Sequence, residues 1–276
     1  MNRINMDLIT LYNQFKNNKN SPAFKVRPVR DLLITELDNN LMLVVASDSD
    51  GGIGPKPSDN VRISGYELGR LAVRVPMLEM LASGALPLFI VDVLAVEMEP
   101  TGRDIIRGVR EEVAEAGLDG SAVVTGSTED NIPTIQTGMG VVAIGLVSKN
   151  DFRPGSSLPG DTVICVGIPK SGMTDKIHYA DPEIADLKAV KTVRSIEGIH
   201  DILPVGSKGI GYELDQLAQS AGLSSRIEDP PAVDLKKSAG PSTCFLVSLP
   251  AEKIDLVRQA IQQPVKNIGS LWQAKK

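Results

Sequence analysis

The stretch MLEMLASGALPLFIVDVLAVEM, residues 77–98, joins the end of a predicted helix to a long predicted strand. The helix begins near Ser64, because Ser64 and Glu67 have the spacing of a capping box, in which each side chain bonds a free amide of the first turn. A proline inside a helix removes a hydrogen bond, so we expect Pro76 to kink the helix or to start a new segment. A strand follows over roughly Leu88–Met98. The apolar side chains of the helix recur at intervals of three, four and seven, which places them on one face: Leu68, Ala72, Val75 and Ala82.

Glu79 lies in the middle of this apolar stripe. A buried carboxylate is costly unless it is paired or coordinates a cation. The position therefore marks a candidate cation ligand. The alternative, a surface residue on a locally rotated helix, stays open at this point.

The elements on either side of this stretch predict an α+β protein of two domains. Two strands, Asp31–Leu37 and Leu41–Ala46, precede the helix, and the polar segment Lys149–Pro159 marks a boundary. We expect one domain at residues 1–148 and the other at 149–276. Strands and helices intermix without strict βαβ alternation, which favours α+β over a doubly wound sheet. The second half is predicted to contain strand Thr162–Val166, a helix opened by Asp181-Pro182, strand Ile202–Val205, helix Gly209–Ala221, strand Cys244–Leu249 and helix Ala251–Gln262.

The composition argues against several classes of function. Aromatic residues make up 4% of the 276 residues and the net charge is -5. Both values disfavour nucleic-acid partners, which need stacking platforms or a basic face. Cys165 and Cys244 lie in apolar runs, and no CxxC or Cys/His cluster indicates a zinc site. No apolar stretch is long enough to span a bilayer, and the first residues lack an apolar signal segment, so we expect a cytoplasmic protein with no membrane partner.

The segment VVASDSDGGIG, residues 44–54, is the first candidate for chemistry. A predicted strand ends in two carboxylates, Asp48 and Asp50, and runs into Gly51 and Gly52. Glycine lets backbone amides approach a phosphate closely, and carboxylate oxygens suit Mg²⁺. Aspartate and glycine are also common turn residues, so an ordinary turn is the alternative.

The segment VDVLAVEMEPTG, residues 91–102, is the second candidate. Glu97 and Glu99 share one face of an extended chain, and Asp92 points to the other. Adjacent carboxylates repel unless a cation lies between them. The alternative is a solvated strand end.

The segment VVTGSTEDNIP, residues 123–133, is the third candidate. A short strand leads into hydroxyl, carboxylate and amide side chains, which suit phosphate and metal but also a plain capped turn. The candidate residues are Gly126, Ser127, Thr128, Glu129, Asp130 and Asn131.

Two later loops each place a lysine among glycines after a strand. They are VGIPKSGM with Lys170 and PVGSKGIG with Lys208. A lysine can neutralise phosphate while loop amides cradle it, although neither loop has the spacing of a Walker A motif. Solvated loop lysines are the alternative.

Taken in order, these segments resemble the aminoimidazole ribonucleotide synthetase superfamily, which includes thiamine-monophosphate kinase, selenophosphate synthetase and the hydrogenase maturation dehydratase. The resemblance covers about residues 40–225, and SGALPLFIVD and GDTVICVG are its most specific parts. It implies that strands of the first domain form a β-barrel in a homodimer and that the second domain is an α/β sandwich. It also implies that ATP lies in a cleft near the subunit interface, with Mg²⁺ bridging its phosphates to acidic residues. The matching positions here are Asp48 and Glu79.

This chain departs from the superfamily in two places. Thr125-Gly126-Ser127 stands where Gly-Gly-acid is usual, which moves the expected metal ligand to Glu129 or Asp130. Residues 204–209 differ from the usual glycine-rich stretch of the second domain. The substrate is therefore expected to differ from that of the synthetase.

The combination of DSDGGIG, VEMEPTG, TGSTEDN and GSKGI looks most like the alpha-ribazole kinases of this superfamily. The resemblance implies an ATP- and Mg²⁺-dependent kinase that phosphorylates the ribose 5′-hydroxyl of a nucleoside. The alternatives are a thiamine-monophosphate-kinase-like or cyclising enzyme and a non-catalytic nucleotide-binding protein.

Each candidate residue receives an expected role under this interpretation. Lys170 or Lys208 offsets developing charge, and Asp92 or Glu97 orients the acceptor hydroxyl. The expected metal ligands are Asp48, Asp50, Glu79, Glu129 and Asp130. The expected nucleotide contacts are Gly51, Gly52, Gly126, Ser127, Thr128 and Asn131.

Overall fold

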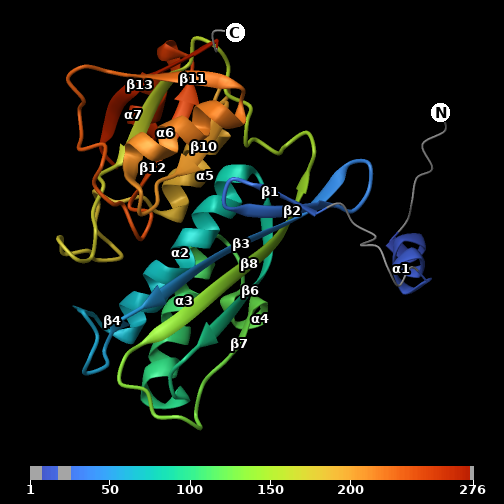
Figure 1. Ribbon diagram of the computed structural model, residues 1–276, viewed down its shortest axis with the longest axis vertical. Helices are drawn as coiled ribbons and strands as arrows, with labels where there is room; N and C mark the ends of the chain where they lie inside the picture. The colour runs from blue at the N-terminus through green and yellow to red at the C-terminus, as the bar shows by residue number, and fades with distance from the viewer. Residues whose placement is uncertain (1–7, 18–25, 274–276) are drawn as a thin grey trace.

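The described part of the chain forms two main β-sheets, which Figure 1 shows one above the other. The computed structural model describes residues 8–17 and 26–273, so part of the predicted 1–148 domain lies outside the described residues. The lower sheet is mixed and has the strand order β1-β2-β3-β8-β6-β7. Its strands are β1 (Val26–Val29), β2 (Leu32–Glu36), β3 (Leu41–Gly51), β6 (Leu86–Leu94), β7 (Val124–Ser127) and β8 (Gly138–Ser148).

The upper sheet is antiparallel throughout, with the order β10-β12-β9-β13-β11. Residues 149–161, which include the predicted boundary, connect β8 of the lower sheet to β9 of the upper one. The strands are β9 (Thr162–Gly167), β10 (Asp201–Pro204), β11 (Leu223–Ile227), β12 (Cys244–Leu249) and β13 (Val265–Gln273). The remaining elements are α1 (Leu8–Asn17), α2 (Gly65–Ser83), α3 (Arg103–Glu115), α4 (Gly120–Val123), α5 (Leu187–Ser195), α6 (Gly209–Ser220), α7 (Ile254–Ala260) and the short pair β4 (Ile53–Gly54) and β5 (Val61–Arg62).

Helix α2 is the element that both sheets share. It packs on β3, β8 and α3 of the lower half and on β10 and α5 of the upper half. The Ser64 hydroxyl accepts the Glu67 amide at 3.2 Å, which confirms the predicted start. The helix ends because Gly84 adopts φ 93, a left-handed conformation that glycine takes without steric cost.

Helix α2 continues through Pro76, so no new segment starts there, and burial along most of the helix compensates for the missing hydrogen bond. Two other expectations about element bounds are wrong. The strand expected at Leu88–Met98 ends earlier, at Leu94, and a π-helical turn begins at Met98. The helix expected at Asp181-Pro182 begins at Leu187, where Asp186 caps it by accepting the Ala189 amide.

The upper sheet is covered on both faces. Along β9, Ile164 and Val166 belong to the core shared with α2, α5 and α7, whereas Val163 and Cys165 belong to the core beneath α6. This follows from the two-residue period of a strand, which sends successive side chains to opposite faces. Cys165 and Cys244 are buried and free, as their apolar surroundings predicted.

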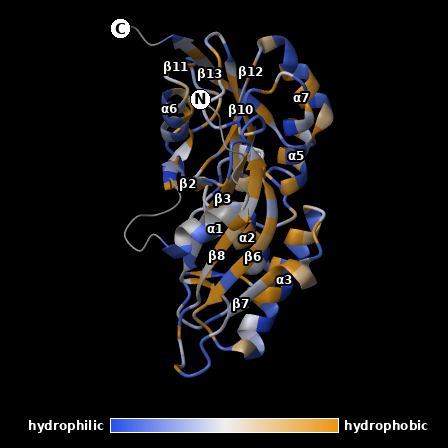
Figure 2. Ribbon diagram, turned by 90° about the vertical axis from the view of Figure 1, so that its right-hand side faces the viewer, coloured by the Kyte–Doolittle hydropathy of each residue, from blue (hydrophilic) through white to orange (hydrophobic). Residues whose placement is uncertain are grey.

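Among the described residues, α2 and α3 cover one face of the lower sheet. Figure 2 shows that hydrophobic residues are frequent along β3, β8 and β6, and some of these side chains are exposed. Leu86, Phe89 and Val93 of β6 are 71%, 43% and 47% exposed, and Leu33 of β2 is 47% exposed. An exposed apolar face of this extent is typical of a protein–protein interface.

A buried ion pair joins the two halves at the turn between β1 and β2. Arg30 occupies that turn with φ 54 and donates from both terminal nitrogens to Asp201 of β10, at 3.0 and 2.5 Å. Asp201 is fully buried and also accepts the Gly155 amide. The ion pair therefore holds the first hairpin against the upper sheet.

A second buried charge cluster joins α2 to α3. Glu112 of α3 accepts from Arg70 at 2.6 Å and from Arg74 at 2.7 Å. Arg74 continues to the carbonyl oxygens of Tyr179 and Ala185, in the loop that precedes α5. Both arginines are thereby neutralised inside the fold. None of the helices in the described ranges is long and apolar enough to cross a membrane.

We expect the substitution Glu112→Gln to lower the free energy of unfolding by about 3–5 kcal/mol, because it removes the buried counter-charge that lies nearest to both guanidinium groups. Glu111→Gln is the matched control, since Glu111 lies next along α3 with a half-exposed side chain 3.8 Å from Arg70. The control should cost at most about 1 kcal/mol. Urea unfolding of both variants measures the difference, and equal losses would contradict the assignment.

Candidate active site between the two halves of the chain

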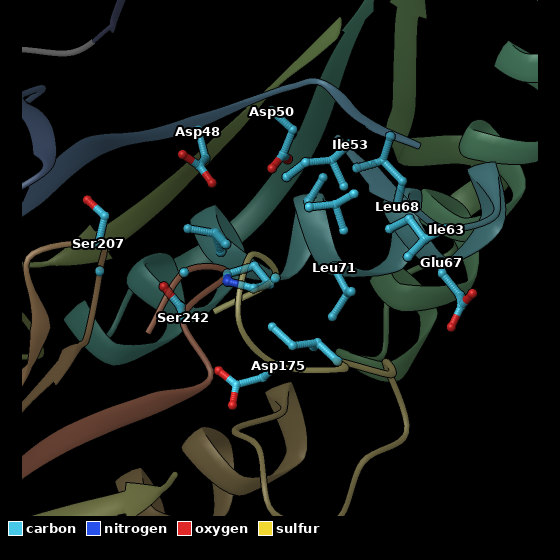
Figure 3. Close-up of a pocket in the computed structure, with 18 of the residues that line it drawn as sticks. Asp48, Asp50, Ile53, Ile63, Glu67, Leu68, Leu71, Asp175, Ser207 and Ser242 are labelled. Carbon is cyan, nitrogen blue, oxygen red and sulfur yellow. The ribbon is translucent and has the colours of Figure 1, made fainter. Parts of the chain in front are cut away.

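A large cavity opens between the two halves of the molecule. Its volume is about 1390 Å³, which exceeds that of an ordinary small-ligand pocket. The lower half contributes β3, the segment 53–63 and one face of α2, and the upper half contributes residues near 172–182, 204–213 and 240–242. Figure 3 shows side chains from both halves pointing into the space.

Carboxylates form one end of the cavity. Asp48 and Asp50 alternate along β3 on the same face as the buried Met42 and Val44, so they lie beneath the sheet near α2. Glu79 of α2 lines the same space. Asp31 follows Arg30 in the first hairpin turn, and Glu213 comes from α6 of the upper half.

These carboxyl groups influence one another through a poorly solvated region. Burial, followed by repulsion from Asp31 and Asp48, raises the pKa of Glu79 to about 8. Burial and repulsion from Asp48 raise the pKa of Asp50 to about 7. Burial also raises the pKa of Asp48. Ionisation of these carboxyl groups is therefore unfavourable in the cavity. A bound cation would stabilise their ionised forms.

Mg²⁺ fits this group of oxygen atoms. The Oε2 atom of Glu79 is buried and has no hydrogen-bond partner in the described residues. No three acidic, histidine or cysteine side chains of that region lie close enough together to enclose a metal by themselves. Mg²⁺ does not need such a cage, because it usually takes one or two carboxylates and completes its shell with water and phosphate oxygens.

Apolar side chains gather on one side of the cavity. Figure 3 shows Ile63, Leu68 and Leu71 together there, with Ile53 beside Asp50 and the Glu67 carboxylate near Ile63. Such a surface suits a ring system.

The buried Asp59 holds the loop that supplies Ile53 and Ile63. Asp59 accepts the Thr137 amide and hydroxyl, both at 2.7 Å, and the Lys56 amide at 2.8 Å. Gly54 packs against Thr137 so closely that a Cβ atom would lie 2.5 Å from its hydroxyl oxygen. The apolar wall therefore rests on a fixed loop.

The two predicted lysines differ in their surroundings. Lys208 lines the cavity at the start of α6, with its Nζ atom 4.2 Å from the centre of the Tyr212 ring. Lys170 does not line it, because its ammonium group donates to Asp181 and Glu183, each at 2.7 Å.

The predicted residues Asp92 and Glu97 also lie outside the cavity lining. Asp92 is 2% exposed and faces the helix-covered side of the lower sheet, opposite Val141 of β8. Burial would raise the pKa of Glu97, but hydrogen bonds from Lys56 and Thr101 lower it to about 2. Glu97 therefore acts as the acidic partner in a local network.

The segment that contains Gly126, Ser127, Thr128 and Asn131 lies at and beyond β7, away from the cavity lining. Its carboxylates close local turns. Asp130 accepts the Met98 amide and the Thr128 hydroxyl, and Glu129 accepts the amides of Asn131 and Ile132.

Gly51 and Gly52 follow Asp50 but do not line the cavity. The Gly52 amide donates to the Thr137 carbonyl oxygen, and the Gly52 carbonyl oxygen accepts from Asn60 and Val61. Gly52 thus closes the loop, with φ 71.

Comparison with known proteins finds a family match in the first half of the chain. Residues 30–147 match the family model described as AIR synthase related protein, N-terminal domain. No curated protein sequence matches the chain.

Solved structures share the fold of most of the chain. Thiamine-monophosphate kinase from Stenotrophomonas maltophilia K279a matches over 96% of this chain and 92% of its own, with 13% identity and a TM-score of 0.63. HypE of E. coli, a hydrogenase maturation protein, matches over 84% and 80%, with 16% identity and a TM-score of 0.63. T. maritima PurL complexed with ATP matches over 87% of this chain and 42% of its own, with 16% identity and a TM-score of 0.64. The chain therefore shares its α+β fold with these three proteins.

Sequence reasoning missed five acidic residues that line the cavity: Asp31, Glu67, Asp175, Asp181 and Glu213. Asp31 lies in a two-residue turn, and aspartate is so common in turns that the sequence gives no signal of a functional role there. Glu213 carries the same signal as Glu79, a carboxylate among apolar side chains at helical spacing, here Ile210, Leu214 and Leu217. That pattern was sufficient to find it.

The raised pKa values predict how stability depends on pH. A carboxyl group whose pKa is higher in the native state binds more protons there, so the free energy of unfolding falls as pH rises between the two values. For Glu79 this window runs from its ordinary value of 4.5 to about 8. We expect the ligand-free protein to lose stability across this range. Glu79→Gln should flatten the slope and raise stability at about pH 8.5 by about 1–3 kcal/mol.

Urea unfolding at several pH values measures this effect. Asp215→Asn is the control, because Asp215 is an exposed carboxylate on α6 that accepts from Ser225. A slope that Glu79→Gln leaves unchanged would show that Glu79 is ionised in the ligand-free protein.

Proposed function

We propose that this chain is an ATP- and Mg²⁺-dependent small-molecule kinase that phosphorylates the ribose 5′-hydroxyl of alpha-ribazole. The observation that carries the proposal is the cavity with Asp48, Asp50 and Glu79 at one end, where the buried Oε2 atom of Glu79 has no partner among the described residues. Those oxygens suit a magnesium ion that carries a triphosphate.

Phosphoryl transfer depends mainly on positioning and electrostatic stabilisation. In the proposed site, Asp48, Asp50 and Glu79 hold Mg²⁺, which neutralises phosphate charge when it is bound. Lys208 offers a cation from the opposite side, and the Ser207 and Gly206 backbone lies beside it in the cavity lining. The apolar wall of Ile53, Ile63, Leu68 and Leu71 takes a ring of one of the substrates.

The comparisons support nucleotide use at the level of the fold. A thiamine-monophosphate kinase and a PurL complexed with ATP have the same architecture. Their identity with this chain is 13% and 16%, so the choice of alpha-ribazole rests on the sequence resemblance.

A substrate panel with detection of ADP tests the proposal. Purified protein with ATP and Mg²⁺ is given alpha-ribazole, thiamine monophosphate or no acceptor. ADP formation with alpha-ribazole alone supports the assignment. Turnover with thiamine monophosphate would favour the thiamine-monophosphate-kinase-like alternative. ATP binding without ADP from any acceptor would favour the non-catalytic one.

We expect Glu79→Gln to lower kcat by at least about 100-fold, because it removes a charged oxygen from the site that stabilises the triphosphate. The protein should remain folded, since the Glu79 side chain makes no hydrogen bond that the fold needs. Asp130→Asn provides the comparison and tests the sequence-based role of the 126–131 segment. We expect it to change kcat by less than about 3-fold, because Asp130 closes a local turn. Normal kcat in Glu79→Gln would remove Glu79 from the site.

We propose further that the chain forms a homodimer through the uncovered face of the lower sheet. The apolar side chains of β6 and β2 on that face have no partner layer among the described residues. A two-fold axis would pair the face with its copy and bury both.

Phe89→Glu should therefore convert a dimer to a monomer, because it places a charge in the centre of the apolar face. Light scattering after size-exclusion chromatography measures the mass. Leu256→Glu is the control, since Leu256 on α7 is 46% exposed, close to the 43% of Phe89. A wild-type monomer, or a dimer that survives Phe89→Glu, would rule out this interface.

A further inference from the structure

Glu213 is a buried carboxylate that the proposed site has not yet used. It lies in the second turn of α6, is 6% exposed and lines the cavity from the upper half of the molecule. Its neighbours Ile210, Leu214 and Leu217 are fully buried beneath the upper sheet. Because α6 packs by that stripe, Glu213 is held at the cavity wall by the helix rather than by a loop.

The carboxylate of Glu213 has open hydrogen-bonding capacity. No lysine or arginine within residues 26–273 forms an ion pair with it. The Gly206 amide is close enough to lower its pKa, yet burial and repulsion from Asp31 raise that pKa to about 7. A carboxylate accepts about four hydrogen bonds, so one amide leaves most of its capacity free.

The nearby cations have other partners. Arg30 donates to Asp201 and Ser220. Lys208 stacks on the Tyr212 ring. Both cations lower the pKa of Glu213, but neither forms an ion pair with it. A ligand hydroxyl would satisfy the carboxylate without adding negative charge.

We propose that Glu213 recognises the phosphate acceptor by accepting a hydrogen bond from the hydroxyl that is to be phosphorylated. The inference rests on the proposed kinase function and names the group that the acceptor presents. Glu213 comes from the upper half, whereas Asp48, Asp50 and Glu79 come from the lower half. An acceptor bound to Glu213 therefore faces the triphosphate across the cavity.

The same carboxylate selects against acceptors that already carry a phosphate at this position, because two negative charges in a poorly solvated site repel. Asp31 strengthens this selection. The site therefore favours a free hydroxyl over a phosphate monoester. Sequence reasoning gave the hydroxyl-orienting role to Asp92 or Glu97, which line no part of the cavity.

Equilibrium binding tests the inference with three probes: alpha-ribazole, its 5′-deoxy analogue and its 5′-phosphate. Calorimetry with the whole protein, Mg²⁺ and a non-hydrolysable ATP analogue measures each affinity. Glu213→Gln should weaken binding of alpha-ribazole by about 10- to 100-fold, the range for a hydrogen bond to a charged group. Binding of the 5′-deoxy analogue should stay unchanged, and binding of the 5′-phosphate, measured without the ATP analogue, should tighten.

Asp215→Asn is the matched control, because it removes an exposed carboxylate two residues away on the same helix. Its affinities should equal those of the wild type. Urea unfolding of both variants excludes loss of folding as the cause, and Glu213→Asp should restore part of the affinity for alpha-ribazole.

Three results would overturn the inference, and they separate it from the proposed function. If Glu213→Gln weakens alpha-ribazole and its 5′-deoxy analogue equally, Glu213 does not contact the hydroxyl. If it weakens the ATP analogue instead, Glu213 belongs with the metal ligands, and the kinase proposal survives. If the wild type binds the ATP analogue but not alpha-ribazole, the proposed acceptor and the role of Glu213 both fail.

Discussion

The fold depends on the burial of α2 between two sheets, because a helix enclosed on most sides must neutralise every charge it carries. Arg70 and Arg74 meet this requirement through Glu112 of α3. Glu79, farther along the same helix, has no such partner in the described residues, and one of its oxygens is buried without a hydrogen bond. The described residues thus pair the buried arginines of α2 internally and leave the carboxylate of Glu79 on the same helix open to a ligand.

The regular repeats of a strand and a helix bring acidic side chains to the cavity from both halves of the molecule. Alternation along β3 sends Asp48 and Asp50 to the same side as the buried Met42 and Val44, next to Glu79. The helical repeat of α6 brings Glu213 to the opposite wall. Each half contributes carboxylates, and the apolar residues of α2 and the 53–63 loop close the other end. Together they form a cavity that has carboxylates at one end and a group of apolar side chains on one side, which suits ligands that carry both polar groups and an apolar ring.

Patterns in the sequence predicted the parts of this arrangement that depend on local order. The helix-to-strand stretch at 77–98, the cap at Ser64 and the buried character around Glu79 all follow from spacing along the chain. The sequence could not show which acidic turns meet in space. The acidic segments at 48–50 and 126–131 look alike in the sequence, yet only the first lines the cavity. The second follows β7, which lies at the edge of the sheet and is separated from β3 by β6 and β8. Asp31 is brought in by a long-range ion pair of its neighbour Arg30, which no local pattern reveals.

The tie between Arg30 and Asp201 has a consequence for how ligands are exchanged. It fastens the halves on one side of the cavity, and Arg74 fastens them again through the carbonyl oxygens of Tyr179 and Ala185. A hinge motion that parted the walls would have to expose a fully buried carboxylate and break a paired guanidinium contact. Ligand exchange would then depend on local movement of cavity-lining residues such as Gly172, Asp175 and Lys176 rather than on rigid-body movement of the two halves.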